Sequence, residues 1–132
     1  MNISHSFIQL ATSDVPRLYG FYKHVVGLPD REDMGPDSFA LGADTTFSIV
    51  DHSDISGPTK EPARFILDLW VDDLDAEQSR LKAAGVNFSR EKGFEHWGGF
   101  ISTFADPDGN LVQVIQYKPE LAQAPQETLA TA

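Results

Sequence analysis

Apolar and polar residues alternate along several short segments of the chain, which is the pattern of strands with one buried face. Two other segments, residues 14–27 and 73–85, instead have apolar residues at helical spacing, with an Asp at the start and a Gly at the end. The pattern therefore predicts an α+β fold, with strands at residues 3–11, 38–41, 46–50, 64–71, 86–89, 100–104 and 111–117.

The order of these elements repeats. An offset of 59 residues places Asp14 on Asp73, Ile8 on Leu67 and Leu10 on Leu69, so the helix-facing positions of one copy coincide with those of the other. The repeat predicts two tandem βαβββ modules whose curved mixed sheets surround a cavity. One domain would then cover residues 1–118, with module one at about 1–52, a linker at 53–63, module two at 64–118 and a flexible tail at 119–132.

A hairpin is predicted to close module two. Its turn, residues 106–110, reads Asp-Pro-Asp-Gly-Asn, in which Pro presets φ, Gly accepts a positive φ, and Asp and Asn bond their own backbone. In the strand after the turn, Val112 and Val114 share one face, and Gln113 and Ile115 share the other. In the strand before it, we expect Phe104 to lie on the same face as Gln113.

The chain is acidic throughout. It carries 20 Asp and Glu against 10 Lys and Arg, a net charge of −10, and each half of the chain contributes −5. This balance argues against nucleic acid or an anionic membrane as a partner. The absence of cysteine excludes thiol catalysis and disulfides. No apolar run approaches a membrane-spanning length and the N-terminus has no signal-peptide pattern, so we expect a cytoplasmic protein.

Two segments carry a resemblance to a known family. SDVPRLYGFYKHVVGL at residues 13–28 and FADPDGNLVQVIQY at residues 104–117, with the repeat between them, resemble the vicinal oxygen chelate superfamily. That superfamily includes glyoxalases, bleomycin-resistance proteins, fosfomycin-resistance proteins and extradiol dioxygenases. The resemblance implies paired βαβββ modules with a ligand cavity between their sheets. It also implies a homodimer, because two chains build the site in many members.

The enzymes of that superfamily hold one divalent metal through His, Glu or Gln. The resemblance maps the four ligand positions onto Phe7, Ser48, Ile66 and Gln113. Two hydrocarbon side chains, a hydroxyl and an amide do not suit a divalent ion, which prefers imidazole nitrogen or carboxylate oxygen. We therefore expect no metal and no cofactor. Whether an atypical metal site uses His5 stays open.

The residues predicted to face the cavity are mostly apolar or aromatic with a few polar points, as in small-molecule pockets. A closed, filled core is the alternative. Asp68 either pairs with Arg64, contacts a ligand that is cationic or donates hydrogen bonds, or acts as a base. The predicted ligand-binding residues are Phe7, Gln9, Ser48, Ile66, Asp68, Trp70, Trp97, Phe104, Gln113 and Ile115.

Four functions are compatible with these features. The first, which we favour, is a metal-free protein that binds a small cationic or aromatic molecule, such as an antibiotic. The second is a divalent-metal-dependent lyase, isomerase or dioxygenase with displaced ligands. The third is a metal-free enzyme that uses Asp68 or His5 as an acid or base. The fourth is a ligandless dimer with a structural or regulatory role.

Overall fold

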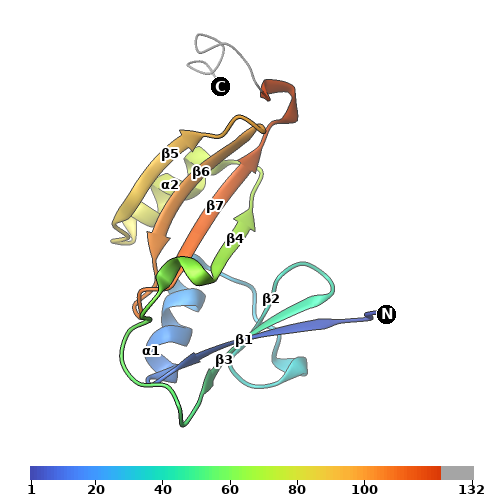
Figure 1. Cartoon of the computed structure of the whole chain (residues 1–132), viewed down its shortest axis with the longest axis vertical. Coiled ribbons are helices and arrows are strands. Elements are labelled where there is room, and N and C mark those ends of the chain that lie inside the picture. The colour runs from blue at the N-terminus through green and yellow to red at the C-terminus, as the bar shows by residue number, and fades with distance from the viewer. Residues whose placement is uncertain (123–132) are drawn as a thin grey trace. The chain divides into compact units, whose positions relative to one another are not determined.

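The computed structural model describes residues 1–122, and the rest of the predicted tail lies outside the described residues. The chain divides into two compact units, residues 1–59 and residues 60 onward. The first contains the predicted module one and the second the predicted module two, with the predicted linker shared between them. Each module is a mixed sheet with its own helix (Figure 1), so the predicted α+β class is confirmed.

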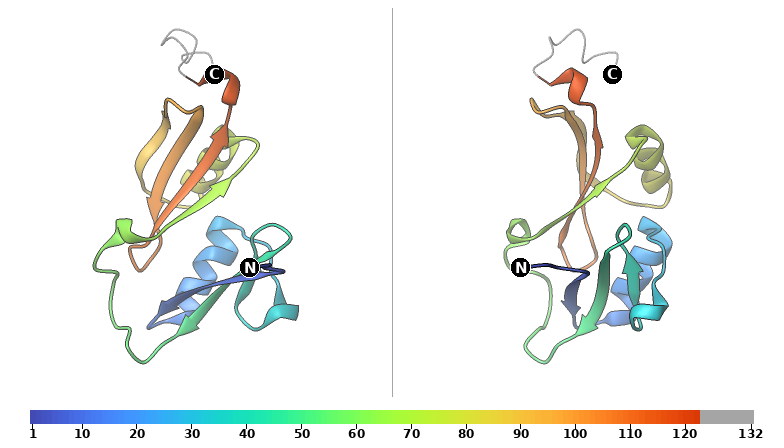
Figure 2. Two further views of the ribbon diagram at one scale, coloured as in Figure 1. Left: turned by 45° about the vertical axis from the view of Figure 1, so that its right-hand side comes forward. Right: turned by 90° about the vertical axis from the view of Figure 1, so that its right-hand side faces the viewer.

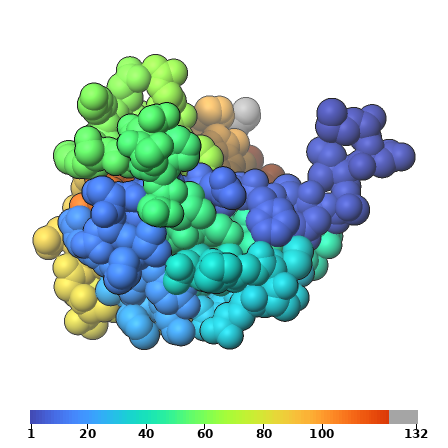
Figure 3. All heavy atoms as spheres, turned by 90° about the horizontal axis from the view of Figure 1, so that it is seen from below, coloured from blue at the N-terminus to red at the C-terminus, as the bar shows by residue number. Residues whose placement is uncertain are grey.

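Module one contains three strands. They are β1 (Ser6–Thr12), β2 (Ser38–Ala40) and β3 (Thr45–Asp51), in the order β1-β3-β2. Strand β1 is parallel to β3, and β2 is antiparallel to β3. The first strand begins at residue 6 instead of residue 3, and residues 1–4, which are exposed, extend away from the rest of module one (Figure 3).

A helical segment covers one face of this sheet. It consists of α1 (Val15–Gly20) and a π-helical continuation, η1 (Phe21–Val26). The Asp14 carboxylate accepts a hydrogen bond from the Arg17 N–H at 3.2 Å and so caps the first turn. Leu18 and Tyr22 are buried on the sheet, where the Tyr22 ring meets Phe47 edge-on at 5.1 Å. Gly27 ends the segment with a φ of 84°.

The repeat predicts three strands after the first helix, but module one has two. The predicted additional strand is replaced by a single bridge between Asp30 and Phe39 and by a short 3₁₀ helix, η2 (Glu32–Met34). Pro29, Gly35 and Pro36 bracket this segment. Proline has no N–H for a strand ladder, and Gly35 has a φ of 123°, so an extended strand does not continue here. Module one is therefore βαββ.

Module two is the complete βαβββ unit. Its strands are β4 (Ile66–Trp70), β5 (Phe88–Phe94), β6 (Gly99–Ala105) and β7 (Leu111–Tyr117), in the order β4-β7-β6-β5. Helix α2 (Leu74–Ala83) lies along one face of this sheet (Figure 2, right). Strand β5 extends into the predicted loop at residues 90–99 and pairs with β6 through two irregularities. Short 3₁₀ helices precede β4 at Pro62–Arg64 (η3) and follow β7 at Pro119–Leu121 (η4).

The register of β6 and β7 corrects one predicted face. Phe104 pairs with Val112, and Ser102 pairs with Val114. These residues lie on the helix side of the sheet, where the Ser102 hydroxyl donates to the Gln78 side-chain oxygen of α2. The prediction that Phe104 shares a face with Gln113 is therefore wrong. Phe104 is fully buried and meets the Phe88 ring edge-on at 5.5 Å.

The face of each sheet turned away from its own helix is called the far face below. In module two the far face carries Gln113, paired with Thr103, and Ile115, paired with Ile101. Asp68 and Trp70 of β4 join this face, because they pair with Gln113 and Ile115. In module one the far face carries Phe7, Gln9 and Ser48.

The hairpin turn is held by one carboxylate. Asp106 is buried, and its oxygens accept from the Asp108 N–H at 2.9 Å, the Asn110 N–H at 3.0 Å and the Asn110 side-chain amide at 2.9 Å. We expect Asp106→Ala to lower the free energy of unfolding by about 1–3 kcal/mol, because it leaves buried donors without an acceptor. Urea unfolding followed by far-UV circular dichroism measures this change.

The exposed N-cap variant Asp73→Ala is the matched control for this experiment. It removes one carboxylate bond, to the Ala76 N–H at 3.0 Å, and should cost about 1 kcal/mol. An Asp106→Ala protein no less stable than the wild type would show that the turn does not depend on this carboxylate.

Candidate functional site

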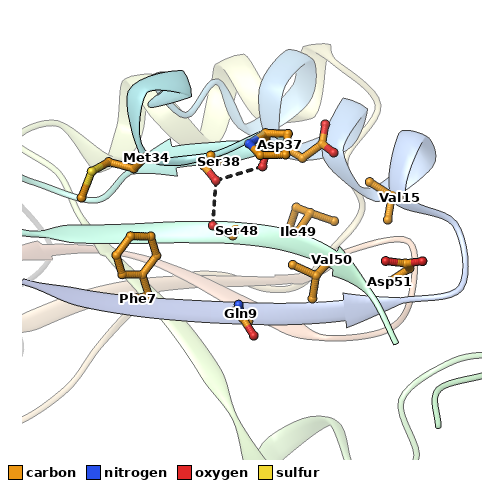
Figure 4. A pocket seen from close by; sticks show the side chains of 12 residues that line it. Phe7, Gln9, Val15, Met34, Asp37, Ser38, Ser48, Ile49, Val50 and Asp51 are labelled. Carbon is orange, nitrogen blue, oxygen red and sulfur yellow. Dashed lines mark hydrogen bonds between the residues drawn. The ribbon is translucent and has the colours of Figure 1, made fainter. Parts of the chain in front are cut away.

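A pocket of about 300 Å³ lies within module one, where β2 begins beside β3 (Figure 4). This volume is at the lower end of the range for small-molecule sites. Three predicted site residues, Phe7, Gln9 and Ser48, lie in its wall. Its lining residues are Phe7, Gln9, Val15, Met34, Gly35, Pro36, Asp37, Ser38, Ser48, Ile49, Val50 and Asp51.

Two buried hydroxyls form a chain in this pocket. Ser38 and Ser48 are paired across β2 and β3, and their Oγ atoms are 2.7 Å apart. Ser38 Oγ also donates to the Pro36 carbonyl oxygen at 3.0 Å. A hydroxyl has one hydrogen, so both contacts form together only when Ser48 donates to Ser38. Ser48 Oγ then has only acceptor capacity left.

The two ends of the pocket differ in character. Phe7 and Met34 lie at one end, whereas Asp37 and Asp51 lie toward the other, near Val15 (Figure 4). None of the lining residues that the structure describes is a Lys, Arg or His. Asp37 has a φ of 52°, a conformation that Asp and Asn adopt more readily than most residues. The pocket is thus apolar at one end and anionic at the other.

A row of polar side chains crosses the far face of module two. Asp68, Gln113 and Thr103 occupy neighbouring positions on β4, β7 and β6. The Gln113 amide donates to Thr103 Oγ1 at 3.3 Å. On β5, Arg90 pairs with Thr103 and binds Glu95 through its guanidinium at 2.8 Å. The amide and the guanidinium therefore already have partners.

Three aromatic rings form a cluster beside this row. The ring centroids of Trp70 and Trp97 are 6.4 Å apart with nearly parallel planes, and Tyr117 lies 5.2 Å from Trp70 and 6.0 Å from Trp97. Trp97 reaches the sheet because its indole lies over Gly99, where a Cβ would collide with the ring. All three rings are partly exposed, and Trp70 is 61% exposed.

Asp68 is the one acid of the polar row without a partner. It forms no hydrogen bond or ion pair with any other of residues 1–122, and Arg64, its predicted partner, binds Glu61 instead at 2.7 Å. Partial burial of the carboxyl raises the pKa of Asp68 above its ordinary value. A ligand that donates a hydrogen bond or carries a positive charge would complement this carboxylate.

The four positions that the resemblance assigns to metal ligands do not suit a metal. Phe7 and Ile66 have no donor atom, Ser48 is bonded to Ser38, and the Gln113 amide donates to Thr103. His5 holds the Thr46 hydroxyl at 2.7 Å. Within residues 1–122, no three His, Asp or Glu side chains come together in a group that could hold a metal ion. These donors do not fit the metal of the superfamily's enzymes.

The structure distributes the predicted site residues over two surfaces. Phe7, Gln9 and Ser48 lie in the module-one pocket. Phe104 lies on neither surface. The far face of module two carries the remaining predicted residues, with Ile66 half-exposed and Ile115 buried: Ile66, Asp68, Trp70, Trp97, Gln113 and Ile115.

Sequence reasoning missed part of each surface. Met34 and Asp37 lie between the predicted helix at residues 14–27 and the predicted strand at residues 38–41, where no periodicity indicates the direction of a side chain. Ser38 was within reach of prediction, because it precedes Phe39 in a short strand whose alternate residues face the helix. Tyr117 has the parity of Gln113 on β7, but only the ring contacts place it in the aromatic cluster.

Comparison with known proteins places the chain in a family. The family model described as the Glyoxalase/Bleomycin resistance protein/Dioxygenase superfamily matches residues 3–114. The uncharacterized protein YraH of Bacillus subtilis (strain 168) is 27% identical over 119 residues, which cover 81% of this chain and 93% of YraH. None of the helices in residues 1–122 is long and apolar enough to cross a membrane.

Solved structures share the fold. TnmS3, an antibiotic binding protein from Streptomyces sp. CB03234, is 32% identical with a TM-score of 0.67, over 89% of this chain and 99% of TnmS3. A glyoxalase/dioxygenase from Nostoc punctiforme is 17% identical with a TM-score of 0.69, over 85% of this chain and 89% of that one. The chain therefore belongs to the glyoxalase/bleomycin resistance protein/dioxygenase superfamily.

Proposed function

We propose that this protein binds a small aromatic molecule without a metal and does no chemistry on it. The observation that carries the proposal is the cluster of Trp70, Trp97 and Tyr117 beside the unpaired Asp68. Partly exposed rings offer stacking area to a planar ligand, and the carboxylate offers an orienting polar contact. The likeness to an antibiotic binding protein at 32% identity supports a ligand of the antibiotic kind.

A homodimer is part of this proposal. The proposal rests on the superfamily resemblance, in which two chains build the site in many members. A second copy of the chain is the partner that the superfamily resemblance implies. Sedimentation velocity of the purified protein at micromolar concentration is expected to give the mass of two chains.

Tryptophan fluorescence tests binding directly, because the chain has two tryptophans and both lie in the aromatic cluster. We expect acridine, a planar tricycle that is neutral at pH 8, to quench this fluorescence saturably. Calorimetry should show Trp97→Ala binding acridine about tenfold more weakly, because stacking of one ring is worth about 1 kcal/mol or more.

Phe65→Ala is the matched control, because Phe65 is a similarly exposed aromatic residue outside the cluster. Its affinity for acridine should equal that of the wild type. Equal losses in both variants would show that the aromatic cluster is not the binding surface.

Removal and addition of metal test the second candidate function. We expect protein treated with EDTA to bind acridine as tightly as untreated protein, because neither hydrocarbon position can supply a ligand. After addition of Ni²⁺, Zn²⁺, Mn²⁺ or Fe²⁺ and removal of the excess, elemental analysis should find well under one ion per chain. One tightly held ion per chain would instead support a metal-dependent lyase, isomerase or dioxygenase.

The raised pKa of Asp68 predicts a pH-dependent cost to stability. The folded state binds this proton more tightly than the unfolded state, so the ionised carboxylate destabilises the fold above its pKa. Asp68→Asn should therefore be more stable than the wild type at pH 7, and the gain should vanish as the pH falls below about 4. Urea unfolding at pH 7 and pH 3.5 measures the difference.

Asp44→Asn, at an exposed loop position of module one, controls for loss of one negative charge. The same variant set tests the binding role of Asp68. If Asp68→Asn is more stable at pH 7 and binds the ligand more weakly, the carboxylate is retained for function at the expense of stability. A variant that is less stable at pH 7 would contradict the assigned cause of the shift.

A further inference from the structure

The module-one pocket offers hydrogen-bond acceptors and negative charge, which the proposed function does not use. Its central acceptor, Ser48 Oγ, is buried, and Ser48 donates its hydrogen to Ser38 when Ser38 donates to Pro36. Ser38 in turn is committed to the Pro36 carbonyl oxygen at 3.0 Å. Hydrogen bonds are therefore donated in one direction, from Ser48 to Ser38 and from Ser38 to the Pro36 carbonyl. Ser48 Oγ can then only accept a hydrogen bond from an occupant of the pocket.

The charged groups of the pocket also favour an occupant that donates hydrogen bonds. Asp37 and Asp51 supply two carboxylates toward one end (Figure 4). The described lining contains no cationic side chain to neutralise them. An occupant that satisfies these acceptors must donate hydrogen bonds, and a positively charged donor satisfies them best.

The opposite end of the pocket suits an apolar group. Phe7 and Met34 lie there, and a thioether beside a ring is an adaptable apolar surface for an aromatic group. Phe7 pairs with Thr46, and Asp51 lies five residues further along β3, so their Cα atoms are about 16 Å apart. An occupant that touches both ends therefore has to be elongated, with its ring at the Phe7 end and its charge at the opposite end.

We propose that the module-one pocket binds a primary arylalkylammonium ion, with its ammonium group toward Ser48, Asp37 and Asp51 and its ring against Phe7 and Met34. This inference rests on the proposed function, because it assigns a ligand class to a protein proposed to bind small aromatic molecules. The module-one pocket and the aromatic cluster of module two are tested with different probes, so the failure of one is distinguishable from the failure of the other.

Matched probes isolate the charge. Isothermal titration calorimetry at pH 7 would compare 2-naphthylmethylamine, which is protonated, with 2-naphthalenemethanol, which has the same ring and a neutral hydroxyl. We expect the wild type to bind the amine at least tenfold more tightly than the alcohol. The double variant Asp37→Asn/Asp51→Asn should reduce this preference to within about twofold, and Ser48→Ala should reduce it by about threefold to tenfold.

These variants are expected to fold. Asn tolerates the positive φ of residue 37 at least as well as Asp, and Ser48→Ala leaves the Ser38 bond to Pro36 in place. Asp44→Asn removes a carboxylate of module one that does not line the pocket, and it should keep the full preference. Thermal unfolding of each variant confirms that binding is measured on folded protein.

Three results would overturn the inference. They are equal affinity for the amine and the alcohol, a preference that survives the double variant, and no measurable binding of the amine by the wild type. Acridine quenching of Trp70 and Trp97 reports on module two, so it shows separately whether the proposed function holds. Quenching by acridine without a preference for the amine would remove this inference alone.

Discussion

One helix covers one face of each sheet, and this constraint determines where function can lie in this protein. A mixed sheet with a helix on a single face buries alternate residues of every strand beneath that helix. The residues between them lie on the opposite face, where they can contact a ligand or a partner. In module two the helix side takes Phe104, Val112 and Val114, which are almost completely buried. The far face receives Asp68, Trp70 and Gln113. In module two, strand parity therefore separates the candidate binding residues from the core residues.

The sequence allowed most of the fold to be predicted, because its signals are local. Asp caps at 14 and 73, closing glycines and alternating strands all act within a few residues, and their repetition revealed the two modules. Parity across the hairpin was harder to predict, since it depends on which residues the turn brings opposite each other. Residues 106–110 form the turn and Ala105 pairs with Leu111, so Phe104 faces the helix. A turn shifted by one residue would have reversed this outcome.

The candidate site was predictable where it lies on strands and not where it lies on loops. Gln9, Ser48 and Asp68 follow from strand periodicity. Asp37 and Met34 line the pocket because a 3₁₀ turn and two prolines replace the expected strand, and no periodic pattern encodes that path. The position of the Trp97 side chain depends on Gly99, because the indole occupies the space where a side chain at residue 99 would lie. A glycine that makes room for another residue is recognisable only once the chain is folded.

The residues at the metal-ligand positions and the acids without a cationic partner both favour an aromatic cation as the ligand. Where the superfamily's enzymes place metal ligands, Phe7 and Ile66 offer apolar surface, and Ser48 and Gln113 are tied to neighbouring hydroxyls. A divalent metal ion brings positive charge into a site. In a site without a metal, the acidic side chains are paired only when the ligand itself carries positive charge. Asp68 is unpaired among the described residues, and the pocket acids Asp37 and Asp51 have no cationic neighbour in its lining. An aromatic cation supplies both the apolar area and the charge, so a single class of ligand accounts for the chemistry of both modules.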